Sequence, residues 1–226
     1  MLLELQNHIV QQNNYTLFNE QLKDAIRKYP NLKIHQDNEG ISYLKGILDI
    51  PNDFHEIVGH FLVEVRYSEK FPFRFPILFE TGGEIPNDAN SHKYKDSSCC
   101  ITVLSDEILK CKNGIIVSLF IEKYAIPYFA NYIYKKQIGE YKNGEYAHGV
   151  IGNCQFYEAL MKTDNRDLWI QYYKTAFRNL KVECGRNDPC FCGSGIKFKQ
   201  CHAEVFNKLW QIGEIQIRND FNLIFI

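Results

Sequence analysis

The spacing of four metal-binding side chains near the end of the chain constrains the fold more than any other feature. Cys190-Phe191-Cys192 is followed, after a loop that contains Gly193 and Gly195, by Cys201-His202. Thiolates and imidazoles are the ligands of tetrahedral structural zinc, and the glycines let the loop fold back without Cβ clashes. We therefore predict a zinc knuckle, with unmetallated or disulfide-bonded cysteines as the alternative. The predicted ligands are Cys190, Cys192, Cys201 and His202.

A Zn²⁺ ion with four protein ligands has no open position for a substrate, so this metal would hold structure and not catalyse.

The chain has 226 residues, of which 45% are hydrophobic, enough for one domain of about 150–180 residues and a small module. A net charge of -1 argues against nucleic acid or an anionic membrane as the main partner.

Two features of the sequence bear on where the protein is located in the cell: the residues near its start and the length of its apolar runs. Glu4 and Gln6 interrupt the opening apolar residues, which argues against a signal peptide. No apolar run approaches the ~20 residues that span a bilayer. We therefore expect a cytoplasmic protein without a membrane partner, whose cysteines are thiols or metal ligands.

Periodicity predicts an α+β fold, with strands that come before most of the helices. A helix is expected over 14–29, because Phe18, Leu22 and Ile26 recur at helical spacing and Pro30 follows. Strands are expected over 32–36, 41–50, 56–67 and 77–79, and helices over 114–125, 127–137, 155–181 and 203–226. The predicted domains are 1–181, the knuckle at 184–203 and a helical, apolar tail at 204–226.

Residues 81–99 form a long polar loop, of the kind that usually carries function. The loop ends in Cys99-Cys100, followed by the apolar Ile101. A thiol at such a junction can be both positioned and accessible, as a nucleophile must be. His92 lies in the same loop. The alternative is that both cysteines are small core residues.

The order of these features resembles the ubiquitin-conjugating enzyme fold. A helix, a strand meander, the element Phe71-Pro72-Phe73-Arg74-Phe75-Pro76, a long loop and Cys100-Ile101 follow one another. The runs 79–83 and 96–100 are similar to bacterial conjugating-enzyme-like proteins of antiphage defence operons. Those relatives commonly carry glycine three residues before the catalytic cysteine. Ser97 stands there if the nucleophile is Cys100, which favours Cys100 over Cys99.

The resemblance implies acyl transfer, in which Cys100 carries the C-terminus of a donor protein as a thioester and passes it to an amine of an acceptor protein. It also implies a donor such as a cGAS/DncV-like nucleotidyltransferase, activated by another protein. Eukaryotic members have His-Pro-Asn before the cysteine, which this chain lacks. His92 falls at the spacing of that asparagine, where an imidazole could support an oxyanion. His148 is a second, weaker candidate, and the role of Cys99 stays open.

The knuckle has a resemblance of its own. Residues 185–195, with Lys197, Phe198, Lys199, Gln200 and Cys201-His202, are very similar to the SEC-C motif at the tail of the SecA translocase motor. That resemblance implies a docking role, with Lys197, Phe198 and Lys199 as the contact surface.

Two rival functions stay open: a non-catalytic peptide-binding module with Cys100 buried, and an adaptor that works through the knuckle. A cysteine protease is disfavoured, because no nucleophile motif of a protease family is present. Cys111 and Cys154 are expected to be buried thiols, and Cys184 is not expected to be a ligand.

Overall fold

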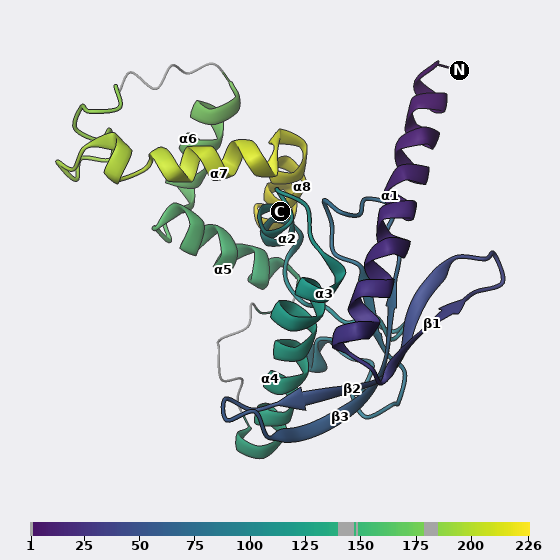
Figure 1. The fold of residues 1–226 in the computed structure, drawn as a ribbon. Coiled ribbons are helices and arrows are strands. Elements are labelled where there is room, and N and C mark those ends of the chain that lie inside the picture. Colours follow the sequence, from purple (N-terminus) through teal and green to yellow (C-terminus); the bar gives the residue numbers. More distant parts are fainter. Residues whose placement is uncertain (1, 140–146, 148, 179–184) are drawn as a thin grey trace. The chain divides into compact units, whose positions relative to one another are not determined.

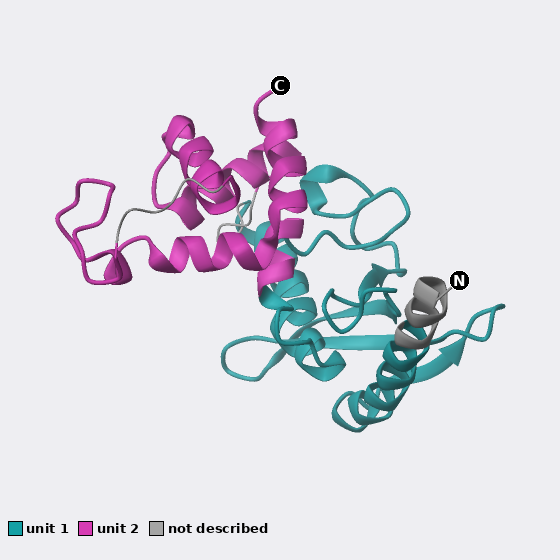
Figure 2. Cartoon of the chain, turned by 90° about the horizontal axis from the view of Figure 1, so that it is seen from above, with its two compact units in different colours: residues 1–102, 110–145 teal, residues 103–109, 146–226 magenta. Residues whose placement is uncertain are grey.

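We describe a computed structural model of the chain that covers residues 2–139, 147, 149–178 and 185–226. The chain divides into two compact units, one of residues 1–102 and 110–145 and the other of residues 103–109 and 146–226 (Figure 2). The first unit is α+β and the second is helical, as the ribbon shows (Figure 1). No helix among the described residues is long and apolar enough to cross a membrane.

The first unit is a four-stranded antiparallel meander with helices. Its strands follow the sequence order β1-β2-β3-β4, so consecutive strands pair directly and no crossover is needed. The elements are α1 (Leu2–Lys28), β1 (Leu32–Gln36), β2 (Ser42–Pro51), β3 (Ile57–Arg66), β4 (Ile77–Glu80), the 3-10 turn η1 (Ala89–Ser91), α3 (Val117–Phe120), the π-helical turn η2 (Ile121–Ala125) and α4 (Ile126–Ile138). These elements confirm the predicted α+β class and all four predicted strands; the helix expected over 14–29 is the second half of α1, which begins at Leu2.

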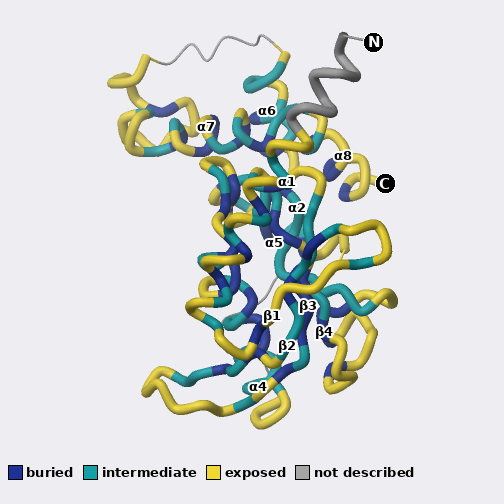
Figure 3. Tube along the Cα trace, turned by 45° about the vertical axis from the view of Figure 1, so that its right-hand side comes forward, coloured by how far each residue is buried: buried dark blue, intermediate teal, exposed yellow. Residues whose placement is uncertain are grey.

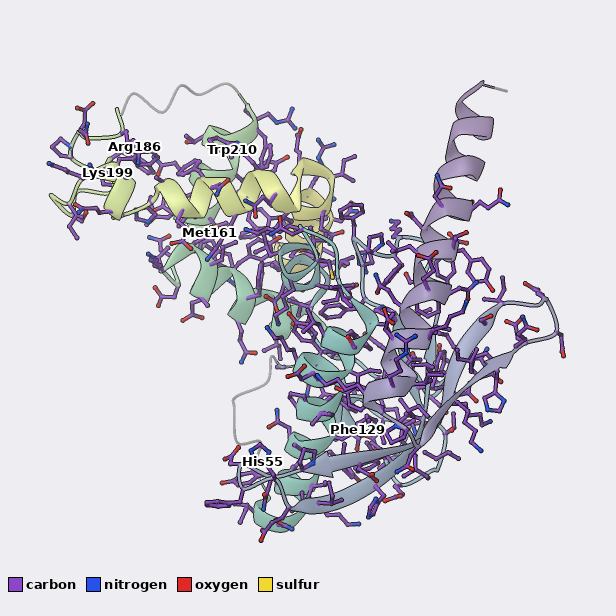
Figure 4. All side chains as sticks on the ribbon, in the orientation of Figure 1. His55, Phe129, Met161, Arg186, Lys199 and Trp210 are labelled. Atoms are coloured by element: carbon purple, nitrogen blue, oxygen red, sulfur yellow. The ribbon has the colours of Figure 1, made fainter. Side chains whose placement is uncertain are left out.

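Alternation along the central strands sets which face of the sheet is buried. In the register of β2 with β3, Leu44 lies opposite Val65 and Leu48 opposite Phe61, and all four side chains are buried (Figure 3). Helices α1 and α4 supply the other side of this core; Phe129 of α4 stacks on Phe61 with ring centroids 4.4 Å apart (Figure 4). The opposite face of β2 is more open to solvent, with Lys45 and Asp49 half-buried and Ile47 exposed, as expected for an antiparallel sheet covered on one side.

Gly46 in β2 is required by a close approach of the backbone. A Cβ atom at this position would lie 2.1 Å from the carbonyl oxygen of Asn31, which leaves no room for any other residue. This contact brings the chain that leaves α1 directly against the centre of the sheet, where β1 begins.

The second unit is a helical bundle that includes the predicted knuckle. Its elements are α2 (Leu104–Lys110), α5 (Gly149–Met161), α6 (Arg166–Phe177), the 3-10 turn η3 (Phe198–Gln200), α7 (Ala203–Ile212) and α8 (Glu214–Ile224). Their apolar faces share one core, which includes Tyr157, Trp169, Phe206, Leu209 and Phe221.

This grouping divides the chain differently from the domains expected at 1–181, 184–203 and 204–226. Helices α5 and α6 lie with α7 and α8, because the amphipathic tail needs an apolar partner and α5 and α6 supply it. The helix expected over 155–181 is two helices. Lys162 ends α5 in the left-handed conformation (φ 58°), and Asn165 caps α6 by accepting from the amide of Asp167 at 3.0 Å. Helix α2 was not predicted.

A buried polar cluster ties three helices of the second unit together. Asp220 of α8 accepts hydrogen bonds from the hydroxyls of Ser105 (2.5 Å) and Tyr157 (2.8 Å) through Oδ2, and from Gln216 Nε2 (2.8 Å) through Oδ1. Ser105 and Tyr157 are fully buried and Asp220 is 4% exposed. A buried carboxylate is tolerated only when its oxygens are hydrogen-bonded in this way.

We predict that Asp220→Ala destabilises the second unit by about 2–4 kcal/mol, because the hydroxyls of Ser105 and Tyr157 lose their acceptor in a dry core. Both tryptophans of the chain, Trp169 and Trp210, lie in this unit, so urea unfolding followed by tryptophan fluorescence reports on it. The exposed Asp164 provides the control, and Asp164→Ala should leave the transition in place. Equal transitions for the two variants would contradict the role given to Asp220.

Candidate functional site

The predicted metal ligands converge in the second unit. One ligand atom from each of Cys190, Cys192, Cys201 and His202 lies within 4.8 Å of every other. The sulfurs of Cys192 and Cys201 are 3.6 Å apart, and His202 Nδ1 lies 3.3 Å from the sulfur of Cys190. A tetrahedral Zn²⁺ with zinc–sulfur bonds of about 2.3 Å needs ligand atoms about 3.5–3.8 Å apart. The arrangement is therefore close to the one that Zn²⁺ requires.

Backbone hydrogen bonds fold the first two ligands into a tight loop. The amide of Gly193 donates to the carbonyl of Cys190 at 3.1 Å, and the amide of Cys190 donates to the carbonyl of Ile196 at 2.7 Å. Gly193 and Gly195 have φ values of 78° and 72°, a region that other residues rarely adopt. The glycines of the motif are thus what turns both cysteine side chains toward one point.

Tyr172 of α6 orients the ring of His202, a contact that was not predicted from the sequence. Its hydroxyl lies 3.1 Å from His202 Nε2, and Nδ1 of the same ring faces the sulfurs. Such a partner fixes the tautomer of a metal-ligating histidine. Burial lowers the pKa of His202, which favours the neutral ring that a metal needs. The ring of Phe191 packs against Tyr172 and Phe206, with centroids 5.6 and 5.8 Å away, which joins the knuckle to the bundle.

The pKa values of two of the cysteines are shifted in opposite directions. Burial raises the pKa of Cys190 to about 11. Burial also acts to raise the pKa of Cys192, but hydrogen bonds from Ser194 outweigh it and lower that pKa to about 7. Thiolates packed this closely repel one another, and a divalent cation removes that cost.

The proposed docking surface of the knuckle is only partly exposed. Lys197 and Lys199 are exposed, and Figure 4 shows Lys199 beside Arg186, whose carbonyl accepts from the amide of Lys199 at 3.0 Å. Phe198 instead packs inward on Phe206, with ring centroids 6.0 Å apart. Ile196, half exposed, is the apolar residue that the loop presents to solvent.

The cysteine-bearing loop of the first unit ends in a short hairpin. Lys93 pairs with Cys99, and the amide of Cys100 donates to the carbonyl of His92 at 2.8 Å. The turn closes where the amide of Ser97 donates to the carbonyl of Tyr94 at 3.0 Å. Ser97 has a φ of 70°. A left-handed backbone of this kind is the conformation that glycine adopts most readily.

The hairpin turns the two adjacent cysteines to opposite sides, because side chains alternate along a strand. Cys99 faces the core with Lys93, and burial raises the pKa of its thiol to about 12. Cys100 lies on the other side with Tyr94, whose hydroxyl donates a hydrogen bond to the Cys100 sulfur at 3.2 Å. The two thiols therefore have different environments, and Cys100 has the one that suits a nucleophile.

His92 contacts Cys100 through its backbone. It ends η1 in the left-handed conformation (φ 51°), and its carbonyl accepts from the amide of Cys100 and from the hydroxyl of Tyr128. The residue is 8% exposed. A role for its imidazole in supporting an oxyanion stays a prediction.

A buried ion pair anchors the start of the loop to its end. Lys93 Nζ lies 2.5 Å from Glu80 Oε2 and donates to the carbonyl of Ile85 at 2.9 Å. Glu80 is 0% exposed and Lys93 3%. Gly82 allows the chain to wrap around the carboxylate, since a Cβ atom there would lie 2.9 Å from Glu80 Oε1.

Helix α4 holds the same loop from its other side. The side chains of Tyr128, Tyr132 and Lys135 each donate to a loop carbonyl, and their spacing places them on one helix face. The acceptors are the carbonyls of Ser91 and His92, of Glu84 and of Asn90.

The remaining cysteines and the second histidine that the sequence singled out lie in different environments or outside the described residues. Cys111 is fully buried in the first core, as predicted. Cys154 is half-buried beside the second core and accepts a long hydrogen bond from Arg166. No disulfide joins the cysteines that the structure describes. His148 and Cys184 lie outside the described residues.

We predict that Lys93→Ala destabilises the first unit by about 3–5 kcal/mol, because it leaves the carboxylate of Glu80 buried without its cation. Urea unfolding followed by far-UV circular dichroism and hydrogen exchange of residues 81–99 measures the effect. Lys95→Ala, two residues on and exposed, is the control and should be silent. If the two variants are equally stable, the ion pair does not anchor the loop. The double variant Glu80→Leu/Lys93→Met should recover part of the loss, since no charge is then buried.

Comparison with known proteins identifies the region around the metal ligands. Residues 186–204 match the model of the SEC-C motif. The chain is 38% identical over 66 residues to the protein translocase subunit SecA of Methylobacillus flagellatus. That similarity covers 29% of this chain and 7% of the relative. No solved structure matches the chain. The motif that holds the Cys/His cluster is thus shown to be a SEC-C motif.

Proposed function

We propose that the Cys/His cluster binds one Zn²⁺ ion and that the ion holds the helical unit together. The ligand atoms have the spacing of a tetrahedral site, and the matched motif is a zinc-binding motif. All four ligands come from the protein, so the ion has no catalytic position. Because Phe191 and His202 pack on Tyr172, metal binding contributes to the stability of α6 and α7 as well as of the knuckle.

We further propose that the chain is a ubiquitin-conjugating-enzyme-like acyltransferase with Cys100 as its nucleophile. One observation carries the proposal. Both thiols are half-buried, but Cys100 accepts a hydrogen bond from Tyr94, whereas the neighbouring Cys99 packs against the core, where burial raises its pKa to about 12. The order of helix, antiparallel meander, long loop and cysteine supports the same function.

The proposed reaction has two balanced steps. The Cys100 sulfur attacks the C-terminal carbonyl of a donor protein that another protein has activated as an acyl adenylate or thioester. A carbon–sulfur bond forms, and the leaving group departs with the proton equivalent that Cys100 lost. An amine of an acceptor protein then attacks the thioester, a carbon–nitrogen bond forms, and the Cys100 thiol is regenerated. The His92 imidazole would donate to the oxyanion, and the donor would be a nucleotidyltransferase-type protein of an antiviral system.

Docking through the knuckle is a second candidate function, and the SEC-C match favours it. Arg186, Lys197 and Lys199 give the knuckle exposed cations around the apolar Ile196. Charges at the rim of an apolar patch suit an acidic protein surface. This function does not need Cys100, so the two candidates are separated by variants at that residue.

We expect purified protein, prepared without chelator, to contain about one zinc per chain by elemental analysis. Cys192→Ser should lose the metal and lower the urea midpoint seen by tryptophan fluorescence, because Trp169 and Trp210 belong to the same unit as the ligands. Cys154→Ser removes a thiol outside the cluster and should keep the zinc. A folded, metal-free preparation of the unaltered chain would overturn the zinc proposal.

We expect Cys100 to carry a protein adduct in its native cells that thiol reagents remove. The tagged chain is isolated under denaturing, non-reducing conditions, and mass spectrometry locates the linkage. Cys100→Ala should abolish the adduct, and Cys100→Ser should convert it to an ester that resists thiols.

Cys99→Ala is the matched control and should keep the adduct. With a pKa of about 12, only about one in ten thousand Cys99 thiols is ionised at pH 8. An adduct on Cys99 would contradict the acyltransferase proposal and leave docking as the function. So would the absence of an adduct on every cysteine of the chain in cells that contain the donor.

A further inference from the structure

We infer that Tyr94 is a catalytic residue of the Cys100 site, where its hydroxyl stabilises the thiolate and so sets the reactivity of the nucleophile. The inference extends the proposed function and rests on it, because Tyr94 is catalytic only where Cys100 is the nucleophile. The hydrogen bond between the two side chains is an observation that does not depend on that function: Tyr94 Oη lies 3.2 Å from the Cys100 sulfur.

The hairpin explains why these two side chains meet. Lys93 pairs with Cys99, and the amide of Tyr94 donates to the carbonyl of Ser98 at 2.8 Å. Tyr94 and Cys100 are therefore diagonal neighbours on one face of the hairpin. The distance between diagonal neighbours, about 7–8 Å between Cα atoms, is within reach of an aromatic side chain. A shorter polar residue at position 94 would not span this distance.

Chemistry favours a phenol in this place. A hydrogen bond to an ionised acceptor is about twice as strong as one between neutral groups, so the Tyr94 hydroxyl stabilises the thiolate more than the thiol. The thiolate is the nucleophile. Tyr94 is 55% exposed, so its ring can rotate aside when an acyl group occupies the sulfur, and the proton stays on the phenol throughout.

Other charged groups of the hairpin are already engaged or turned away. Lys93 is bound to Glu80 of β4 on the buried face, and Lys135 of α4 is bound to the carbonyl of Asn90. Hydrogen bonds from Ser98 lower the pKa of Asp96, and Lys95 is exposed at the turn. The imidazole of His92 is the remaining titratable side chain next to this face. The hydroxyl of Tyr94 is the donor that the structure places on the sulfur.

The test is alkylation of Cys100 by iodoacetamide from pH 6 to 9.5, in the full chain, with Cys100 followed by peptide mass spectrometry. Tyr94→Phe keeps the ring and removes the donor. Losing one hydrogen bond to a charged group lowers the thiolate fraction about tenfold at pH 7. The freed thiolate is intrinsically more nucleophilic, so the net rate falls roughly threefold. As the pH rises and Cys100 becomes ionised in both proteins, this difference should vanish and then reverse, because the more basic thiolate of the variant is the better nucleophile.

Tyr132→Phe is the matched control. It also removes one tyrosine hydroxyl that contacts this loop, at the carbonyl of Glu84, but it leaves the Cys100 sulfur untouched. Its alkylation profile should follow that of the unaltered chain. A Tyr94→Phe profile that overlays the unaltered one, or a change shared by both variants, would overturn the inference.

Alkylation needs no acyl donor, so this result is independent of the acyltransferase proposal. A shifted profile for Tyr94→Phe together with no adduct in cells would keep the hydrogen-bond role and remove its catalytic meaning. An adduct on Cys100 together with an unshifted profile would keep the acyltransferase and reject Tyr94.

Discussion

The geometry of the cysteine-bearing loop depends on one buried ion pair, between Glu80 at the end of β4 and Lys93 near the end of the loop. Both groups are removed from water, which costs several kcal/mol per ion unless every charge is matched. Each of the two charged groups also has hydrogen-bond partners in the backbone. The carboxylate also accepts from the amides of Glu84 and Ile85, and the ammonium also donates to a carbonyl. A loop tied at both ends in this way can hold the next residues, 94–100, in a single hairpin.

From that anchor the position of Cys100, the proposed nucleophile, follows step by step. Fixing Lys93 on the buried face fixes Cys99 on the same face, since the two residues pair. Alternation then turns Cys100 outward, and the diagonal partner Tyr94 reaches its sulfur. A slip of one residue would exchange the two thiols, and it would also expose the ammonium of Lys93 or leave Glu80 without it. The ion pair therefore selects the register as well as the place of the loop.

Much of the fold could be predicted from local pattern. The alternation of Leu44, Leu48 and Ile50 indicates a half-buried strand, and the glycines and cysteines of residues 190–202 leave few ways to fold. The Cys/His cluster was predicted in full and is confirmed. Local pattern did not predict side-chain hydrogen bonds between residues distant in sequence, such as Tyr172 with His202 or Ser105 with Asp220. A tyrosine or serine on a helix has the same local signature whether it faces solvent or a ligand.

The same reason explains why the two compact units differ from the domains expected from the sequence. The apolar side chains of α5 and α6 would fit a core of either unit, and only their packing on Phe206, Leu209 and Phe221 shows which one they complete. Once α5 and α6 are assigned to the helical unit, the knuckle is no longer a free appendage. His202 is the N-cap residue of α7, and its ring contacts Tyr172 of α6. A change at the Cys/His cluster is thereby transmitted to the helices through aromatic contacts, so the proposed zinc would stabilise the whole unit and not the knuckle alone.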